Sequence, residues 1–214
     1  MKIEVEVKYP GVNLDAVRVR LEQAEAVSAG IFLERNVVFD TPERALLSAG
    51  CLLRVRECEG AGHNGGLFTF KRPAAGDRIS GYKRQEERET RLTNPQTMHT
   101  VLAMLGYPEA FAYDKVREIY HWREVEVCLD LLPFGDEEDG AYPVVELEGE
   151  EGDIERAVQM LGLPASLVSV NNYHELNKQW RSDKNLPPRD SFVFSESWLV
   201  KIREELRRMT TARG

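Results

Sequence analysis

The sequence predicts an α+β fold built around a mainly antiparallel β-sheet. Most strand-like segments alternate apolar and charged residues, which is the period-two pattern of a strand with one buried face. These segments follow one another through short turns, which favours hairpins. A few helix-like segments lie between these hairpins, which is the element order of the α+β class.

The first predicted strand is "IEVEVK", residues 3–8, which ends at a Pro-Gly turn. Asn13 then caps an amphipathic helix, whose apolar face contains Leu14, Val17 and Leu21. The second strand lies in "FLERNVVFDTP", residues 32–42, and a Thr-Pro turn closes it. Residues 43–50 are expected to form a helical turn that ends at Gly50.

Two further strands are predicted on either side of a glycine-rich segment, "EGAGHNGG". This segment contains Gly60-x-Gly62-x-x-Gly65, a formal match to the dinucleotide-binding fingerprint. No helix follows it, so we interpret residues 59–66 as a hairpin loop. The motifs GxxxxGK[ST], HExxH and GxSxG do not occur in the sequence.

Residues 81–150 predict one helix and four more strands. The very polar segment 81–92 is interpreted as a strand. Asn94 and Pro95 then open a helix that stops at Gly106. The remaining strands are expected at residues 111–122, 123–133 and 142–150, with an acidic turn, "GDEEDG", before the last.

The composition changes near residue 180, which we take as the end of the domain at residues 1–180. Before that point Asp153 is expected to cap a helix through Leu161, and Pro164 to begin a short one. "RSDKNLPPRD" then reads as a linker, and residues 195–209 as a helix. Its apolar face contains Trp198, Ile202, Leu206 and Met209. Residues 181–214 are thus a linker and helical tail, which docks either on the domain or on a partner.

Composition excludes several classes of function. The 214 residues are 42% hydrophobic and 30% charged, as in ordinary globular proteins. No apolar run is long enough to span a membrane, and the N-terminus lacks a secretory pattern, so we expect a cytoplasmic protein without a membrane partner. The net charge of −8 argues against nucleic acid as a partner, although a local basic site can lie within an acidic shell. The three cysteines have no metal-like spacing and fit a reducing compartment.

The charged faces of the predicted strands contain almost only ionisable residues, and the sign of their charge differs from strand to strand. Some strands carry only cations and others only carboxylates. The cations are Arg54, Arg56, Lys71, Lys115 and Arg117, and the carboxylates are Glu126, Asp130, Glu146 and Glu148. A solvated face would mix in neutral polar residues. If the sheet closes into a barrel, with the charged faces inside and helices covering the apolar outside, these groups converge on one channel.

Convergent cations inside a barrel would repel one another by about 4 kcal/mol per pair at 4 Å separation and an effective dielectric near 20. A polyphosphate among them reverses the sign of that energy, and guanidinium groups match its oxygens bidentately. The neighbouring carboxylates would repel phosphate unless a hard divalent cation bridged them. The pattern therefore predicts a ligand made of a polyphosphate and a metal ion, against the alternative of ordinary surface salt bridges.

Several motifs together resemble the CYTH superfamily, or triphosphate tunnel metalloenzymes. Glu4-Val5-Glu6-Val7-Lys8 matches the ExExK signature of that family. The further matches, in family order, are Phe39-Asp40-Thr41, Leu53-Arg54-Val55-Arg56, Phe70-Lys71-Arg72-Pro73, Lys115-Val116-Arg117, Leu129-Asp130, Glu146-Leu147-Glu148 and Asn172-Tyr173-His174-Glu175-Leu176. The resemblance covers about residues 1–180. The family includes class IV adenylyl cyclases, thiamine triphosphatases and inorganic triphosphatases.

The resemblance implies a closed, eight-stranded antiparallel tunnel that binds a triphosphate with Mg²⁺ or Mn²⁺. It implies that Glu6, Asp130 and Glu148 hold the metal, with Glu4 and Glu146 assisting. The implied phosphate contacts are Lys8, Arg54, Arg56, Lys71, Lys115 and Arg117. Lys83, Glu87 and Glu89 are added to the expected substrate-binding set from the overlay of the strand at 81–92, and Glu4 of the ExExK motif is included in that set as well.

The sequence departs from the family pattern at two positions. An R-x-E-x-E strand is common in the family, and the overlay places Glu87 and Glu89 on its acids but Gln85 on its arginine. Lys83 shares the face of Gln85 and can supply the cation, whereas Arg84 would need a β-bulge. Val38 stands where mammalian-type thiamine triphosphatases have a tyrosine, which argues against a dedicated enzyme of that kind.

Two reactions fit such a ligand. A metal-activated water can attack the terminal phosphorus, or the ribose 3′-hydroxyl of ATP can attack the α-phosphorus and release pyrophosphate. Lys8, desolvated among cations, is a candidate base with a lowered pKa in either case. A non-catalytic sensor of nucleotide or polyphosphate is the alternative. The residues do not select the triphosphate, and they leave room for a homodimer.

Overall fold

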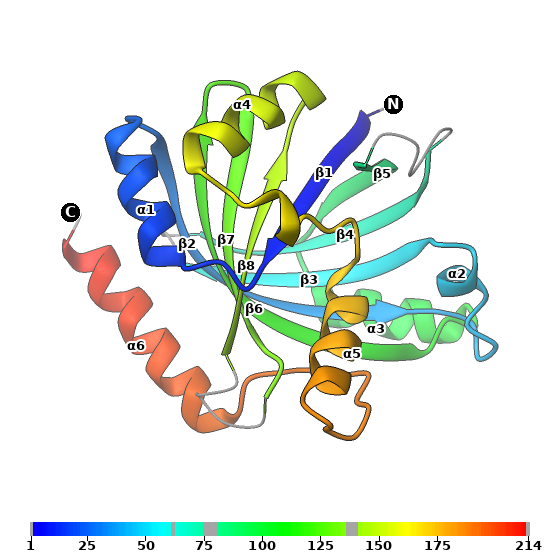
Figure 1. Ribbon diagram of the computed structural model, residues 1–214. Coiled ribbons are helices and arrows are strands. Elements are labelled where there is room, and N and C mark those ends of the chain that lie inside the picture. Colours follow the sequence, from blue (N-terminus) through cyan, green and yellow to red (C-terminus); the bar gives the residue numbers. More distant parts are fainter. Residues whose placement is uncertain (1, 61–62, 75–80, 136–140, 213–214) are drawn as a thin grey trace.

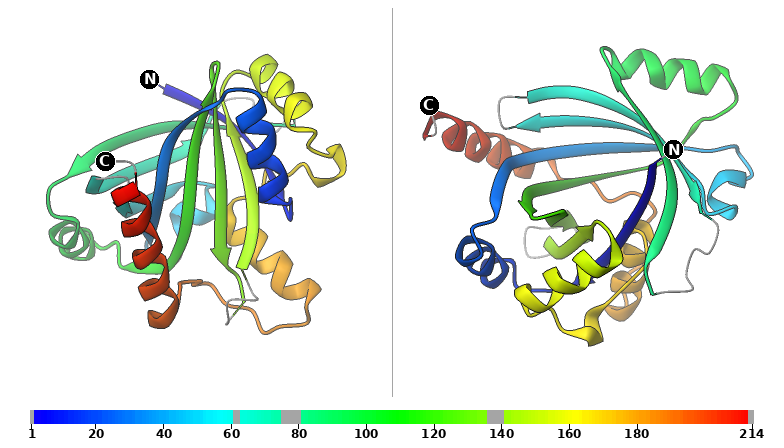
Figure 2. Two further views of the ribbon diagram at one scale, coloured as in Figure 1. Left: turned by 90° about the vertical axis from the view of Figure 1, so that its left-hand side faces the viewer. Right: turned by 90° about the horizontal axis from the view of Figure 1, so that it is seen from above.

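A computed structural model of the chain confirms the predicted fold class (Figure 1). It describes residues 2–60, 63–74, 81–135 and 141–212. Eight antiparallel strands close into a barrel in the order β1-β5-β4-β3-β2-β6-β7-β8, with β8 paired to β1. Helices lie around the outside of this barrel, as the view from above in Figure 2 shows. Within the described residues, no helix is long and apolar enough to cross a membrane.

The strands account for every strand-like segment of the sequence. They are β1 (Lys2–Pro10), β2 (Val27–Phe39), β3 (Leu52–Gly60), β4 (His63–Pro73), β5 (Lys83–Leu92), β6 (Glu109–Trp122), β7 (Val125–Pro133) and β8 (Ala141–Glu148). The helices are α1 (Leu14–Gln23), α2 (Ala45–Ser48), α3 (Pro95–Met104), α4 (Glu151–Leu161), the 3₁₀ turn η2 (Ala165–Leu167), α5 (Tyr173–Asp183) and α6 (Glu196–Ala212).

The predicted helix caps are confirmed for two helices and wrong for a third. Asn13 accepts a hydrogen bond from the Ala16 amide at 3.1 Å, and Asn94 caps α3 in the same way. Helix α4 begins at Glu151, before the expected cap Asp153. Asp153 instead lies in the first turn and accepts a hydrogen bond from Arg156. An acid in this place is stabilised by the helix dipole, so sequence alone does not distinguish it from a cap.

The glycine-rich segment at residues 59–66 is mostly strand rather than loop. Gly60 pairs with His63 and Cys58 pairs with Gly65, so β3 and β4 run almost to the tip of their hairpin. A side chain at Gly60 would place a Cβ 2.3 Å from the Ile31 carbonyl oxygen, and its φ is +140°. Glycine is therefore required by close strand packing here. The tip itself, residues 61–62, lies outside the described residues, as do residues 136–140 of the predicted acidic turn.

The hydrophobic core lies on the outer face of the barrel, beneath the helices. Helices α1 and α4 cover β1, β7 and β8, with Leu21 and Ile154 fully buried against Val7, Val127 and Leu147. Each such side chain contributes about 1.5–3 kcal/mol on burial. This core leaves the charged face of each strand pointing inward, as the alternation predicts.

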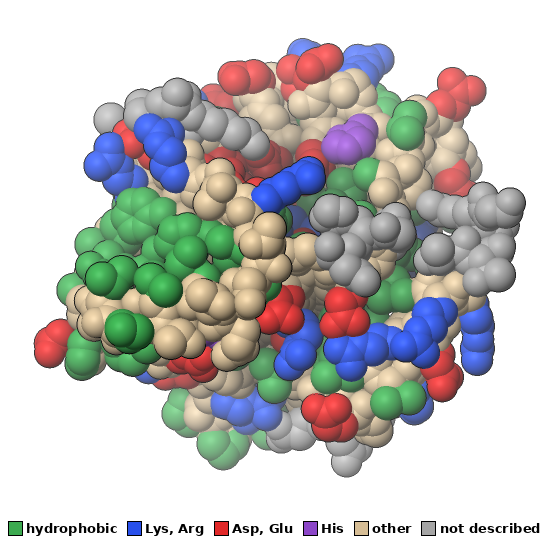
Figure 3. Space-filling model, turned by 180° about the vertical axis from the view of Figure 1, so that it is seen from behind, with side chains coloured by type: hydrophobic (Ala, Val, Ile, Leu, Met, Phe, Trp, Pro, Cys, Tyr) green, Lys and Arg blue, Asp and Glu red, His purple; other side chains and the backbone are tan. Residues whose placement is uncertain are grey.

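Helix α3 covers part of the barrel but keeps an apolar face towards solvent. Leu102 is buried in the core, whereas Val101, Met104 and Leu105 are 40%, 82% and 67% exposed. Hydrophobic side chains gather on this side of the molecule in Figure 3. The expected homodimer stays a prediction.

The C-terminal tail docks on the barrel. β6 pairs with β7 only from Val116 onward, and the chain near Phe192 runs along the preceding stretch of β6. The Phe192 amide donates to the Ala112 carbonyl, and its carbonyl accepts from the Asp114 amide, both at 3.0 Å. Phe192 is fully buried, and α6 then packs Leu199, Ile202 and Leu206 against the barrel. The division of the chain into a domain at residues 1–180 and a linker with a helical tail at residues 181–214 stays a prediction.

Beneath the tail, Asp114 is buried with a carboxyl group that accepts a hydrogen bond from the Phe194 amide at 3.1 Å. Burial raises the pKa of Asp114 to about 6, although Arg35 and this hydrogen bond oppose the rise. Because the pKa of Asp114 is higher in the folded than in the unfolded state, the protonated carboxyl group contributes its full stabilisation below about pH 4. That contribution is lost as the pH rises through 6. We therefore expect Asp114→Asn, which keeps the acceptor oxygen, to raise the unfolding free energy at pH 8 by about 1–3 kcal/mol.

This gain should shrink to nearly zero at pH 4. Urea unfolding of both proteins across pH 4–8 measures it, with the exposed Asp15→Asn as a control that should show little change. An equal gain at both ends of the pH range would show that the charge of Asp114 is not the cause.

Candidate functional site

A cavity of about 460 Å³ occupies the interior of the barrel and is lined by the charged stripes. Of the predicted site residues, all but Asp130 line it. Asp130 is fully buried behind Arg117, whose guanidinium it holds at 2.6 and 2.7 Å. The closed barrel therefore gathers residues from seven strands, and Glu4 and Glu148 are 144 positions apart in the chain.

The charges of the tunnel are divided between two walls. One wall, formed by β4, β3 and β6, carries Lys71, Arg54, Arg56, Lys115 and Arg117. The wall formed by β7, β8, β1 and β5 carries Glu126, Asp130, Glu146, Glu148, Glu4, Glu6, Glu87 and Glu89. Lys8 and Lys83 lie on the acidic wall and Glu34, from β2, on the basic one.

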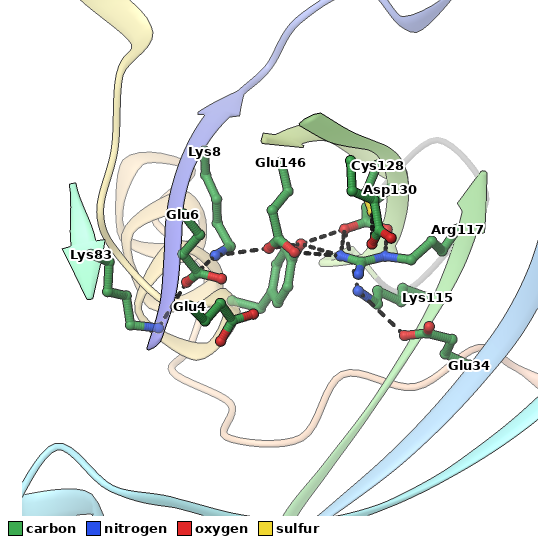
Figure 4. Close-up of polar contacts among 12 residues, drawn as sticks. Glu4, Glu6, Lys8, Glu34, Lys83, Lys115, Arg117, Cys128, Asp130 and Glu146 are labelled. Atoms are coloured by element: carbon green, nitrogen blue, oxygen red, sulfur yellow. Dashed lines mark hydrogen bonds and ion pairs between the residues drawn. The ribbon is translucent and has the colours of Figure 1, made fainter. Parts of the chain in front are cut away.

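A chain of ion pairs with alternating sign crosses the tunnel (Figure 4). Its contacts are Lys83–Glu6 at 2.9 Å, Glu6–Lys8 at 2.7 Å, Lys8–Glu146 at 2.8 Å, Glu146–Arg117 at 2.8 Å, Arg117–Asp130 at 2.6 Å, Asp130–Lys115 at 3.3 Å, Lys115–Glu34 at 3.3 Å and Glu34–Arg56 at 3.1 Å. Beside it, Lys71 pairs with Glu4 and Glu87. Each interior group of this series contacts an oppositely charged group on both sides, and the two terminal groups, Lys83 and Arg56, contact one each.

The pairing keeps the buried carboxylates ionised. Burial alone would raise the pKa of Glu6, but Lys8 and Lys83 outweigh it and hold that pKa far below its usual range. The pKa values of Glu34 and Glu146 are lowered in the same way, against burial, by the Arg and Lys groups beside them. These acids therefore remain available as anionic oxygen donors over the whole physiological pH range.

Lys8 differs from its predicted state. We expected it among cations with a lowered pKa, but β8 lies next to β1 and places Glu146 beside it, opposite Glu6. Burial lowers the pKa of Lys8, and the two carboxylates outweigh that effect and raise it above its usual value. This is the direction opposite to the one a general base needs. Lys8 is held as a cation.

Arg54 is the exception to the pairing. It is 5% exposed, and within the described part of the chain no carboxylate lies within ion-pair distance of its guanidinium. Its Nη1 donates to the Tyr113 hydroxyl at 3.1 Å and its Nη2 to the Thr69 hydroxyl at 3.3 Å, while Nε has no hydrogen-bond partner among the described residues. A buried charge paired only with neutral groups is costly. Among the residues that the structure describes, Arg54 is therefore a buried cation without an anionic partner.

The strand β5 follows the register in which Lys83, Gln85, Glu87 and Glu89 face the tunnel. Its pairing with β1 and β4 shows no shift, so no β-bulge turns Arg84 inward. Arg84 lies on the outer face and pairs with Glu151 at 2.5 Å. Lys83, whose ammonium reaches Glu6, is thus the cation that this strand supplies.

Sequence reasoning missed several residues of the tunnel. Glu34 escaped notice because Arg35 is also charged, which hides the alternation of β2. Tyr113 and Tyr173 bind Arg54 and Asp130 through hydroxyl groups that no charge pattern reveals. Asp40, part of a quoted motif, does not line the cavity and accepts hydrogen bonds from the Leu46 and Leu47 amides, so it anchors α2.

Three carboxylates form a row across the acidic wall. Glu6 stands opposite Glu148 in the β1–β8 register, and Glu148 stands opposite Glu126 in the β7–β8 register. The described residues contain no group of three acidic, His or Cys side chains already drawn together as a metal cage. Mg²⁺ needs only one or two carboxylates when phosphate oxygens and water complete its shell. The hard oxygen donors of this row fit such an ion.

Comparison with known proteins places these features in a wider group. The sequence profile of the CYTH domain matches residues 2–162. A Methanocaldococcus jannaschii protein named "putative adenylate cyclase" is 27% identical over 82% of this chain and 93% of its own length. The structure of a "putative adenylate cyclase" from Vibrio parahaemolyticus is 26% identical, with a TM-score of 0.66 over 82% of this chain and 97% of that one.

A structure from Hippeastrum shares the fold at lower identity. It superimposes with a TM-score of 0.57 and 21% identity, over 89% of this chain and all of that one. That protein is described as a "putative adenylyl cyclase" with a dominant triphosphatase activity.

Proposed function

The chain belongs to the CYTH domain family, and we propose that it is an enzyme that binds a triphosphate in its tunnel with Mg²⁺ or Mn²⁺ and cleaves a phosphoanhydride bond. The observation that carries this proposal is Arg54, a buried guanidinium without a carboxylate partner in the described chain. A phosphate group would supply the missing anion. Its oxygens match the free Nε and neighbouring Nη atoms of a guanidinium.

The two walls suit the two parts of such a ligand. Phosphate oxygens would lie against Arg54, Arg56, Lys71, Lys115 and Arg117, and the acidic row would face the opposite side of the phosphate chain. We assign Glu6 and Glu148 as metal donors. Asp130 and Glu146, also expected to hold metal, have both carboxylate oxygens engaged by Arg117 and by neighbouring Lys and Tyr side chains, so we give them the role of counter-ions. Glu6 differs from them, because its ion pairs with Lys8 and Lys83 use the same oxygen, Oε1. We assign Glu4 as the counter-ion of Lys71.

The bound metal would polarise the phosphate oxygens and offset the charge that develops as the bond breaks. Lys8 and Arg117, both fixed as cations, would stabilise charge on the leaving phosphate. The phosphate chain would lie among buried side chains, where the lower effective dielectric strengthens each of these interactions. This machinery serves hydrolysis by water and cyclisation by a ribose hydroxyl equally well.

One experiment tests the proposal and separates its outcomes. The protein is incubated with Mg²⁺ or Mn²⁺ and with ATP, tripolyphosphate or thiamine triphosphate, and the products are resolved by chromatography. Orthophosphate release identifies a triphosphatase, and cyclic AMP with pyrophosphate identifies a cyclase. Binding without either product supports the alternative, a non-catalytic sensor, and absence of binding refutes the tunnel assignment.

The metal assignment makes a separate prediction. Glu148→Gln should raise the Mg²⁺ concentration that gives half-maximal activity by about tenfold or more, because it removes one anionic donor while keeping the shape of the side chain. Glu89→Gln is the matched control, since Glu89 also lines the tunnel but lies on β5 and pairs with Thr69. Metal titrations of activity measure both. Equal shifts in the two variants would contradict the assignment of Glu148.

A further inference from the structure

At one end of the tunnel, several of the lining residues are uncharged. There α2 and the start of β3 bring Leu47 and Leu52 against Phe111 of β6. Phe111 packs 6.3 Å from the ring of Tyr113, whose hydroxyl accepts from Arg54. The uncharged end therefore adjoins the guanidinium that we assign to phosphate. A phosphate chain alone would leave this part of the cavity without a partner of matching chemistry.

His174 lies at this end and is held in a fixed orientation. Its ring stacks on Phe111, with the centroids 4.4 Å apart and the planes 17° from parallel. Its Nε2 lies 2.9 Å from Asp190 Oδ1, and Asp190 is itself held by Arg44 at 2.9 Å. Asp190 belongs to the C-terminal tail, so the tail contributes directly to the orientation of a tunnel residue.

These contacts select one tautomer of His174. Burial lowers the pKa of His174, against the effect of Asp190, so the ring is neutral at physiological pH. The pKa of Asp190 is lowered too: burial would raise it, but hydrogen bonds from His174 and Arg44 outweigh that effect, so this carboxylate only accepts. Nε2 must then carry the proton and Nδ1 the lone pair. In the described chain no group donates to Nδ1, although His174 lines the cavity.

We propose that His174 Nδ1 accepts a hydrogen bond from an organic group attached to the triphosphate, and that His174 thereby selects nucleoside triphosphates over inorganic tripolyphosphate. Asp190 is a positioning residue that holds the accepting tautomer. The donor on the ligand is a ribose hydroxyl or an exocyclic amine of the base, which share this chemistry. The inference rests on the proposed function, because it requires the phosphates to lie beside Arg54.

Two substitutions of His174 separate its two nitrogen atoms. The amide nitrogen of His174→Gln falls near the place of Nε2, so it keeps a donor to Asp190 but offers no acceptor at Nδ1. The amide oxygen of His174→Asn falls near Nδ1 and keeps the acceptor. We expect His174→Gln to weaken binding of the β,γ-methylene analogue of ATP by about 5- to 10-fold, and His174→Asn to restore most of that loss.

Tripolyphosphate provides the control, because it carries no organic group. Its affinity, measured by calorimetry with Mg²⁺, should be the same in the wild type and both variants. Asp190→Asn should weaken only the ATP analogue, and ¹⁵N shifts of the His174 ring should show loss of the single tautomer. Thermal unfolding checks that each variant is folded.

The outcomes are distinct. Equal changes for both ligands, or none for either, would overturn the inference while leaving the proposed function intact. Failure of the wild type to bind either ligand would overturn the proposed function and this inference with it. If the donor is a ribose hydroxyl, the 2′,3′-dideoxy analogue will bind wild type and His174→Gln equally. If the donor is the amine, the inosine analogue will do so.

Discussion

Replacing Arg54 by Met should reduce the affinity for tripolyphosphate and for ATP by at least about 100-fold without lowering the stability of the protein. The loss of binding is expected because charge-assisted hydrogen bonds to a buried ligand contribute about 1.5–3 kcal/mol each, and a guanidinium makes more than one. Stability should be unchanged or higher, because the guanidinium is buried without a counter-ion in the described chain. Calorimetric titration and urea unfolding measure the two effects.

Arg56→Met is the matched control for this prediction. Arg56 lies two residues further along β3 on the same face, but its Nη1 is 3.1 Å from Glu34. Its removal leaves the buried Glu34 with Lys115 as its remaining close partner, so unfolding free energy should fall by about 2–4 kcal/mol. If both variants lost stability equally, Arg54 would have a partner in solution that the structure does not show, and the assignment of Arg54 to a ligand would fail.

The contrast between these neighbours also shows what a sequence can and cannot reveal. The alternation of β1 is sufficient to place Glu4, Glu6 and Lys8 on one face, because side-chain direction depends only on position in the strand. It does not reveal that Lys8 lies between Glu6 and Glu146, since that depends on which strand pairs with β1 and in which register. The sequence therefore predicts most of the charged residues of the tunnel but not which of them pair with one another.

The same dependence on tertiary contacts explains the other differences between the sequence-based predictions and the structure. Gly60 lies in a segment with the composition of a loop, yet the close approach of β2 makes glycine the residue that fits at this position of the strand. His174 lies on α5, and Asp190 lies 16 residues later in a linker-like segment. Only the return of the tail along β6 brings the two side chains together. Such contacts come from tertiary packing, which local patterns do not encode.

Asp130→Ala should have the opposite effects to Arg54→Met. Asp130 is fully buried and accepts from Arg117, from Lys115 and from the Tyr173 hydroxyl. Its removal leaves Arg117 with Glu146 and Lys115 with Glu34, each one carboxylate short. We expect the unfolding free energy to fall by about 3–5 kcal/mol, the usual cost of breaking a buried ion pair. Urea unfolding at pH 7 measures it.

Ligand binding distinguishes a counter-ion from a metal donor at Asp130. If Asp130 balances the cations, as the contacts indicate, Asp130→Ala exposes uncompensated positive charge and should bind tripolyphosphate more tightly than the wild type in metal-free buffer with EDTA. If Asp130 instead held the metal, metal-free binding would be unchanged and binding with Mg²⁺ would weaken. Added tripolyphosphate should also restore part of the lost stability, because a ligand that binds only the folded state stabilises it. A variant that lost both stability and metal-free affinity would contradict the division of the tunnel into counter-ions and metal donors.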